Sequence, residues 1–243
     1  MFEKDYNKIN LNNELVEAVL KSNLEKAKEL FALESPPYVN VEINGVPLIL
    51  HAAQKKDWAM VEELYNMEAD LDAKVPYLQW HLIHECVKNA PERVAKAVID
   101  YCNINAQTKD GKTALMVAIK EEKQEMANHL VDLGRMDLSI VDKEHKNAAH
   151  YAAQFGQYEL FIKLIQAGAP INKEDKEGKT PVDLITDPTF KENLPKVLGE
   201  LAKIEKIKKK DLEEDSTVIV QVEEIKKEEV KPKVSGLSSI KRR

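Results

Sequence analysis

Residues 142–173 carry the clearest pattern of hydrophobic and polar positions. A polar, turn-forming segment at 142–146 precedes an alanine-rich run over 147–155, which predicts a short helix that ends at Gly156. The apolar residues that follow recur at i, i+1, i+4 and i+5 and form one stripe on a second helix: Leu160, Phe161, Leu164 and Ile165. Gly168 ends this helix and turns the chain back. Because neither helix buries its stripe alone, the pattern predicts units that stack on one another.

The same unit recurs along the chain. Three tetrapeptides start 34 and then 33 residues apart, and each precedes a segment that opens a helix: Lys109-Asp110-Gly111-Lys112, Lys143-Glu144-His145-Lys146 and Lys176-Glu177-Gly178-Lys179. A period of about 33 residues is typical of a helical repeat array. Such arrays present a long concave surface, so the period predicts protein binding as well as an all-α fold.

This unit resembles the ankyrin repeat, whose pattern is roughly D-x-x-G-x-T-P-L-H-x-A-A-x-x-G followed by V-V-x-x-L-L-x-x-G-A-D-V-N. The unit departs from the pattern at His145, Asn147 and Ala148, where Gly, Thr and Pro are usual. The matching positions are Asp142, His150, Ala152-Ala153, Gly156, Leu164-Ile165, Gly168-Ala169 and Asn172. Similar units begin near Gly111 and at Asp175. The resemblance implies helix-turn-helix repeats with β-turn fingers.

Earlier units are in phase but eroded. Residues 48–72 keep Ala52-Ala53 and residues 84–105 keep Val98-Ile99 at the expected places. Residues 12–40 keep only the two-helix rhythm, which is typical of an N-terminal cap with a polar outer face. We therefore expect an ankyrin solenoid of about five to six repeats over residues 11–190, with the first repeat a degenerate cap.

The chain changes character after the array. A run of apolar residues on one helical face predicts a C-terminal capping helix over residues 191–210 that covers the last repeat. Residues 211–243 are rich in Glu, Lys, Val and Ser and offer little to pack, so we expect a flexible charged tail.

Composition narrows the class of protein. The 243 residues, 43% of them hydrophobic, suffice for one array and little else. No apolar run is long enough to span a bilayer, and the N-terminus lacks the apolar core of a signal peptide, so we expect a cytoplasmic protein. Two cysteines, Cys86 and Cys102, favour reduced thiols over a disulfide.

The sequence contains no recognisable catalytic pattern. It has no glycine-rich phosphate loop, and no pair of its six histidines lies with a cysteine or carboxylate at a known metal spacing. The resemblance assigns His84 and His150 to the repeat histidine, which bonds neighbouring turns. A nucleophilic pair of Cys86 and His84 is formally possible, but residues i and i+2 of a helix point apart. We therefore expect no enzyme activity, no metal and no cofactor.

The resemblance also implies which positions face a partner: those beside the fingertip glycine and two positions late in each first helix. In the third unit the fingertip holds Tyr77, Leu78 and Trp80. Exposed aromatic residues beside a polar rim are typical of a binding hot spot, although an eroded repeat could also fold Trp80 inward. The candidate partner-binding residues are Tyr77, Leu78, Trp80, Lys112, Lys120, Lys146, Phe155 and Lys179.

Two lysines flank each of the last three fingertips, and this set is here called the lysine comb: Lys109, Lys112, Lys143, Lys146, Lys176 and Lys179. Lysines on neighbouring fingers are about 8–10 Å apart if neighbouring helices pack at the usual distance. Carboxylates at Asp110, Glu144 and Glu177 lie between these lysines. Either the comb is solvated and self-paired, or it is a polar rim that meets an acidic partner. The interleaved acids and the net charge of −6 argue against nucleic acid.

Two patterns in the tail suggest further partners. Val218, Ile219, Val220 and Val222, flanked by acids, resemble a SUMO-interacting motif, which adds a strand to a sheet edge; alternatively this segment docks on the C-terminal helix. Residues 223–229 resemble the glutamate-rich C-terminal signal of substrates of the bacterial Dot/Icm type IV secretion system. With the eroded repeats and the abundance of Lys, Asn and Ile, the chain is similar to Legionella-type ankyrin effectors.

Together these patterns predict a non-enzymatic protein–protein interaction module. The leading hypothesis is a secreted bacterial effector that binds a host protein in the host cytosol through its concave ankyrin surface. The alternative is an endogenous cytoplasmic adaptor or inhibitor. Neither hypothesis involves nucleic acid or membrane insertion.

Overall fold

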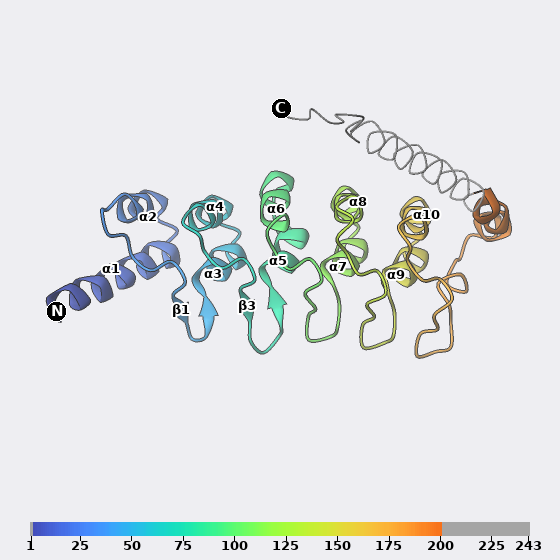
Figure 1. The fold of residues 1–243 in the computed structure, drawn as a ribbon, viewed down its shortest axis with the longest axis horizontal. Helices are drawn as coiled ribbons and strands as arrows, with labels where there is room; N and C mark the ends of the chain where they lie inside the picture. Colours follow the sequence, from blue (N-terminus) through green and yellow to red (C-terminus); the bar gives the residue numbers. More distant parts are fainter. Residues whose placement is uncertain (1, 201–243) are drawn as a thin grey trace, which may run out of the picture. The chain divides into compact units, whose positions relative to one another are not determined.

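Consecutive helix pairs stand side by side in a row (Figure 1). The loop or hairpin that precedes each pair from the second onward projects from the same edge of the row and is here called a finger. The computed structural model describes residues 2–200. The row belongs to one compact unit, Met1–Lys191. A helix over residues 188–200 runs into the second unit, Glu192–Arg243, whose remaining residues lie outside the described part.

Five helix pairs follow one another in the described residues. In each pair an inner helix is succeeded by an outer helix that packs on it, and from the second pair onward the inner helix follows a finger. The inner helices are α1 (Phe2–Leu20), α3 (Leu48–Gln54), α5 (Leu82–Asn89), α7 (Ala114–Lys120) and α9 (Ala148–Gln154), and the outer helices are α2 (Leu24–Phe31), α4 (Trp58–Asn66), α6 (Glu92–Ile99), α8 (Gln124–Asp132) and α10 (Tyr158–Gln166). The predicted all-α repeat fold is confirmed.

Polar N-caps start the inner helices of the later repeats. The side chain of Thr113 accepts a hydrogen bond from the backbone N–H of Met116, and that of Asn147 accepts one from His150. Each cap satisfies a backbone donor that the first turn of a helix leaves free. Asn147 therefore makes the N-cap hydrogen bond that the usual threonine makes at this repeat position.

Two of the fingers are short antiparallel hairpins. Strand β1 (Glu42–Ile43) pairs with β2 (Val46–Pro47), and β3 (Lys74–Val75) pairs with β4 (Trp80–His81). The next finger is held by one bridge, between Gln107 and Thr113. Each finger thus leads its chain into the following inner helix.

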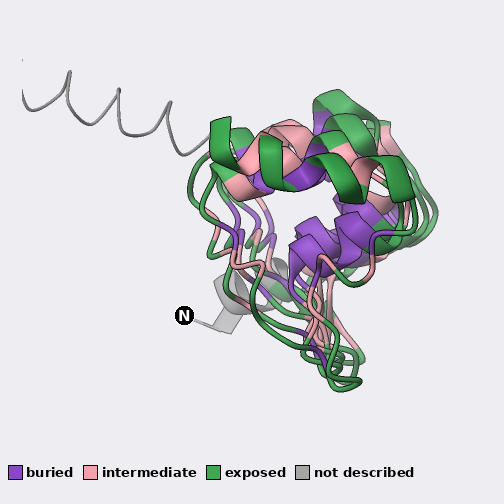
Figure 2. Ribbon diagram, turned by 90° about the vertical axis from the view of Figure 1, so that its right-hand side faces the viewer, coloured by how far each residue is buried: buried purple, intermediate pink, exposed green. Residues whose placement is uncertain are grey.

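The core lies between the two layers of helices. Figure 2 shows the inner helices of the later repeats mostly buried, whereas the outer helices are exposed along one side. Residues 114–119 of α7 and 148–153 of α9 are all buried, while α10 buries only the stripe of Leu160, Phe161 and Leu164. Small alanines on α9 let neighbouring helices approach closely, so the apolar stripes of successive repeats form one continuous core.

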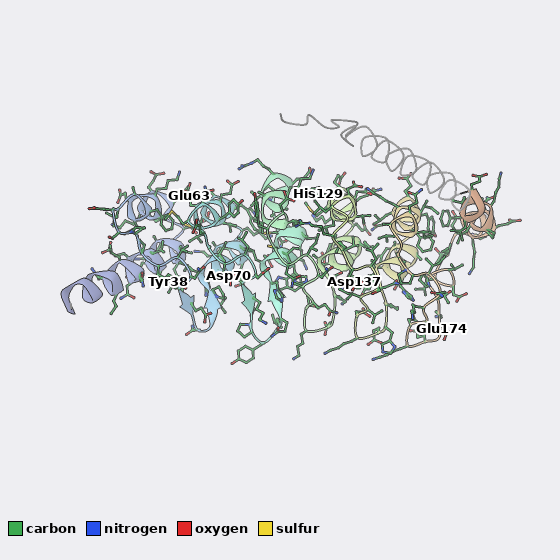
Figure 3. All side chains as sticks on the ribbon, viewed as in Figure 1. Tyr38, Glu63, Asp70, His129, Asp137 and Glu174 are labelled. Carbon is green, nitrogen blue, oxygen red and sulfur yellow. The ribbon has the colours of Figure 1, made fainter. Side chains whose placement is uncertain are left out.

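Side-chain caps also join the turns that follow the outer helices. The side chain of Asn40 accepts a hydrogen bond from the backbone N–H of Asp70 at 2.7 Å, and that of Asn105 accepts one from Asp137 at 2.9 Å. Figure 3 labels Asp70 and Asp137 in these turns, and Glu63 and His129 on the outer helices. The side chain of Asp72 likewise accepts the backbone N–H of Asn103. Hydrogen bonds from Asn and Asp side chains therefore also join successive repeats at the turns after the outer helices.

The last predicted repeat departs from the pattern. Its finger is formed, with Asp175 accepting the N–H groups of Glu177 and Lys179. Where its inner helix would follow, residues 181–184 form a turn only. Pro188 disfavours helical conformation at Asp187 and so limits an inner helix here to the residues before Asp187.

The predicted capping helix lies only partly within the described residues. Residues 191–200 are helical, whereas residues 201–210 and the tail at 211–243 fall outside the described part. None of the helices in residues 2–200 combines the length and apolarity that crossing a membrane requires.

Candidate protein-binding surface

Two adjoining cavities lie between the fingers and the inner helices of the third to fifth repeats. Their volumes are about 310 Å³ and 440 Å³, and they share Asp110, Lys112 and Lys120, so they form one continuous groove, here called the finger groove. The first cavity is lined by Leu78, Trp80, Lys88, Thr108, Lys109, Asp110, Lys112, Val117, Lys120 and Glu121, and the second by Asp110, Lys112, Lys120, Asp142, Lys143, Glu144, Lys146, Tyr151, Gln154 and Phe155.

Backbone hydrogen bonds fix the spacing of the fingers that border this groove. The N–H of Lys109 donates to the carbonyl of Leu78 at 2.8 Å, and the N–H of Lys143 donates to that of Asp110 at 2.9 Å. The N–H of Lys176 continues the series, donating to Glu144 at 3.0 Å. The fingers that form the rim of the groove are therefore joined to one another by backbone hydrogen bonds.

The same position of successive fingers has a positive φ: Gly45, Gln79, Gly111, His145 and Gly178. The residue after it is Trp80 in the finger of the third repeat and a lysine in the next three fingers. Trp80 therefore occupies the position that Lys112, Lys146 and Lys179 hold in their own fingers.

The apolar end of the groove is made by Leu78 and Trp80 of the third repeat and by Val117 of the fourth. Leu78 is 57% exposed, while Trp80 is half-buried and Val117 is buried. The indole N–H of Trp80 donates to a carboxylate oxygen of Glu85 at 2.9 Å, and its ring centroid lies 5.3 Å from that of His84. Trp80 is thus held in one orientation and still lines the cavity.

Lysines without ion pairs make the middle of the groove. For Lys109, Lys112, Lys120 and Lys143 the structure records no salt bridge within residues 9–200. Lys88, at the edge, is paired with a carboxylate oxygen of Glu121 at 3.2 Å. These four ammonium groups therefore have no carboxylate oxygen of residues 9–200 at salt-bridge distance.

An aromatic pair closes the other end. Tyr151 and Phe155 are stacked, with centroids 6.2 Å apart and 7° between the ring planes, and Phe155 is 38% exposed. The Tyr151 hydroxyl donates to Asp142 Oδ2 at 2.6 Å, and burial together with this carboxylate raises the pKa of Tyr151. Asp142 Oδ1 accepts the N–H groups of Glu144 and Lys146, so this wall is rigid.

The lysine comb is self-paired at its C-terminal end. Lys176 lies 3.7 Å from a carboxylate oxygen of Glu144, and Lys179 lies 2.8 Å from one of Glu177. Lys146 lies 3.8 Å from Asp175 and donates to the side chain of Gln154 at 3.3 Å. The lysines of the last finger are therefore paired, whereas no salt bridge within residues 9–200 is recorded for Lys109 and Lys112 of the fourth repeat. The finger of the fifth repeat is mixed, with Lys146 paired and Lys143 not.

The structure shows a structural role for the repeat histidine His84. Its Nδ1 accepts the backbone N–H of His81 at 3.1 Å, and its Nε2 lies 3.2 Å from the carbonyl of Lys112 in the next repeat. Burial lowers the pKa of His84 to about 4, so the ring is neutral.

The two cysteines are free and buried. Burial raises the pKa of the Cys86 thiol, and a thiol that stays protonated is a poor nucleophile. No cluster of three or more His, Cys, Asp or Glu side chains suited to a metal ion occurs in the described part of the chain.

Six of the eight partner-binding candidates line the finger groove: Leu78, Trp80, Lys112, Lys120, Lys146 and Phe155. Tyr77, 86% exposed, and Lys179 line neither of its cavities. The groove also includes Val117 and Tyr151, which sequence reasoning missed because both occupy core-facing helical positions. The tail candidates Val218, Ile219, Val220 and Val222 lie outside the described residues.

Comparison with known proteins places the repeats in a family. Residues 83–175 match the model for ankyrin repeats in three copies. The chain is 27% identical over 148 residues to "Neurogenic locus notch homolog protein 2" of Homo sapiens, and 28% identical over 116 residues to "Protein glp-1" of Caenorhabditis elegans. These alignments cover 53% and 42% of this chain but only 6% and 9% of the relatives, so the chain spans a small part of their length. The family match therefore identifies residues 83–175 as ankyrin repeats, and the row of helix pairs in the described residues is consistent with an ankyrin solenoid.

Proposed function

We propose that the chain is a non-enzymatic module that binds another protein in the finger groove. One observation carries this proposal: an apolar end, a set of unpaired ammonium groups and a half-exposed aromatic ring follow one another along a single groove. Interfaces commonly combine aromatic anchors with a polar rim. Tyr77 extends the apolar end from the fingertip.

The rigidity of the groove favours tight binding. Its rim is tied by backbone hydrogen bonds between fingers, and Trp80 and Tyr151 are held by their own hydrogen bonds. A surface that is already ordered loses little conformational entropy when a partner binds. Little of the favourable free energy of the contacts with the partner is therefore offset by ordering of the groove.

Truncating the anchors tests the proposal. We expect Leu78→Ala and Phe155→Ala each to weaken binding of a partner isolated by affinity capture by at least about 2 kcal/mol, roughly thirtyfold, the loss typical of a hot spot. Both side chains are partly exposed, so neither change should disturb the fold. The measurement is isothermal titration calorimetry with the purified partner.

Tyr101→Ala is the matched control, because Tyr101 is an exposed aromatic residue that lines neither cavity of the groove. Its affinity should equal that of the unmodified chain. A partner that is lost with Tyr101→Ala and retained by both groove variants would contradict binding in the finger groove.

We further propose that the module is a bacterial effector delivered to the cytosol of a host cell, with an endogenous cytoplasmic adaptor or inhibitor as the alternative. The support is the glutamate-rich segment at residues 223–229. Residues 204–243 fused to a translocation reporter should be exported by a Dot/Icm system, and replacing the glutamates of 223–229 with alanine should abolish export. Export that is unchanged by this replacement, or absent from the fusion altogether, would favour the adaptor.

A SUMO-binding role for the tail is a separate proposal, supported by the acid-flanked apolar sequence of Val218, Ile219, Val220 and Val222.

A further inference from the structure

We propose that the partner of the finger groove is an extended acidic peptide segment with an apolar residue at each end. This inference rests on the proposed function, since it concerns the same groove, and it adds the chemistry of what binds there. The carboxylates of the segment lie along Lys109, Lys112, Lys120 and Lys143, and its apolar residues lie at the two ends of the groove.

The first argument is charge. The acids that line the groove already have partners: Glu121 is paired with Lys88, and Glu144 lies 3.7 Å from Lys176. Asp142 accepts two backbone N–H groups and the hydroxyl of Tyr151. Asp142 keeps its negative charge because these donors are neutral, so two carboxylates without a paired lysine, Asp110 and Asp142, stand against four lysines for which no salt bridge is recorded in residues 9–200. The groove is therefore positive within a chain of net charge −6, and its complement is an anion.

The second argument is the spread of the positive charge. Lys109 and Lys112 belong to one finger, Lys143 to the next, and Lys120 to the inner helix between them. Asp110 lies between Lys109 and Lys112 in the sequence, so a compact dianion placed there would meet a like charge. Carboxylates on alternate residues of an extended chain are about 7 Å apart, which suits lysines on repeats about 8–10 Å apart. A chain with spaced carboxylates therefore fits better than one concentrated anion.

The third argument is the position of the apolar surfaces. Leu78 and Trp80 belong to the third repeat and Phe155 to the fifth, two repeat steps away. Two steps of about 8–10 Å correspond to five or six residues of extended chain at about 3.3 Å each. The recognised segment thus has an apolar residue, about four residues rich in Asp and Glu, and a second apolar residue.

Defined peptides test the inference on the full chain. The probe is a fluorescein-labelled peptide containing Leu-Asp-Glu-Asp-Glu-Phe, compared with Leu-Asn-Gln-Asn-Gln-Phe and with Ala-Asp-Glu-Asp-Glu-Ala, by fluorescence anisotropy at low and at physiological ionic strength. We expect the first peptide to bind at least about tenfold more tightly than either of the others, with the advantage over the amide peptide shrinking as salt is added.

Two double variants locate the charge contact. Lys112→Gln/Lys143→Gln should reduce the affinity for the acidic peptide to that for the amide peptide. Lys96→Gln/Lys179→Gln removes the same charge from lysines that are paired with Glu92 and Glu177 and lie outside the groove, and it should change nothing. Equal losses in the two variants would show that general charge attraction suffices, and would overturn the inference.

Two other outcomes also overturn it, and they are distinct from failure of the proposed function. If the amide peptide binds as tightly as the acidic one, and Leu78→Ala weakens both, the groove binds peptides without preferring acids. If none of the peptides binds, the segment is not what the groove recognises, and the calorimetry with a captured partner decides separately whether the groove binds protein.

Discussion

Gly111→Ala is expected to lower the free energy of unfolding by roughly 2–5 kcal/mol, because it both strains one finger and pushes the next away. Gly111 has a φ of +82°, a conformation that costs a residue with a Cβ about 1–2 kcal/mol. A Cβ there would lie 3.0 Å from the Cα of Asp142 and 3.2 Å from the nitrogen of Lys143. That nitrogen donates to the carbonyl of Asp110, so the second finger cannot retreat without losing a hydrogen bond. Overpacking of this kind costs about a further 1–3 kcal/mol.

Urea denaturation followed by circular dichroism measures this effect, and Gly178→Ala is the control. Gly178 holds the same finger position with a φ of +76°, but nothing lies within 4 Å of its added Cβ. This variant should therefore lose only the strain, about 1–2 kcal/mol. If the two variants lose the same amount, contact between neighbouring fingers is not a source of stability.

Acidification is expected to destabilise the array through His84, by about 3 kcal/mol between pH 6.5 and pH 4. Burial lowers the pKa of His84 to about 4 in the folded chain, whereas the unfolded chain keeps the ordinary value near 6.5. As the pH falls through this window the unfolded state takes up the proton first, so stability that is fully present above pH 6.5 is lost towards pH 4. Each unit of difference corresponds to about 1.4 kcal/mol. The lowered pKa of His150, also caused by burial, acts in the same direction.

Urea unfolding at a series of pH values, with His84→Gln as the test variant, isolates this contribution. The variant is expected to be less stable near neutral pH and to show a flatter dependence on pH, because it has no imidazole to protonate. His145→Gln, which changes an exposed histidine on a fingertip, should keep the slope of the unmodified chain. Parallel curves for His84→Gln and the unmodified chain would show that acid acts through other groups.

The repeat fold was predictable because each repeat is a local structure. Hydrophobic spacing within about 30 residues specifies both helices, and the recurring tetrapeptides give the register of the fingers. That register was enough to place Leu78 and Trp80 on a fingertip, and six of the eight residues that it selected line the groove. The shortened last repeat was also visible in principle, since Pro188 interrupts it.

The pairing of the lysines was not predictable, because it depends on the length of single side chains. Three fingers carry Lys, an acid and a second Lys in the same order. Glu144 and Glu177 reach a lysine, whereas Asp110, one methylene shorter, makes no salt bridge recorded within residues 9–200. The hydrogen bond from Tyr151 to Asp142 was also not predictable from the sequence, because a tyrosine among the alanines of an inner helix is expected only to pack in the core.

The hydrogen bonds from Lys109, Lys143 and Lys176 to the preceding fingers use backbone atoms alone. These links therefore separate what the repeats need for folding from what they need for recognition. The carbonyl of Leu78 accepts from Lys109 whatever side chain residue 78 carries. A finger can thus exchange lysine and acid for tyrosine, leucine and tryptophan without losing its link to the next. The fingertip sequence is consequently free to diverge, and a lineage of such proteins could acquire new partners one finger at a time while the scaffold stays the same.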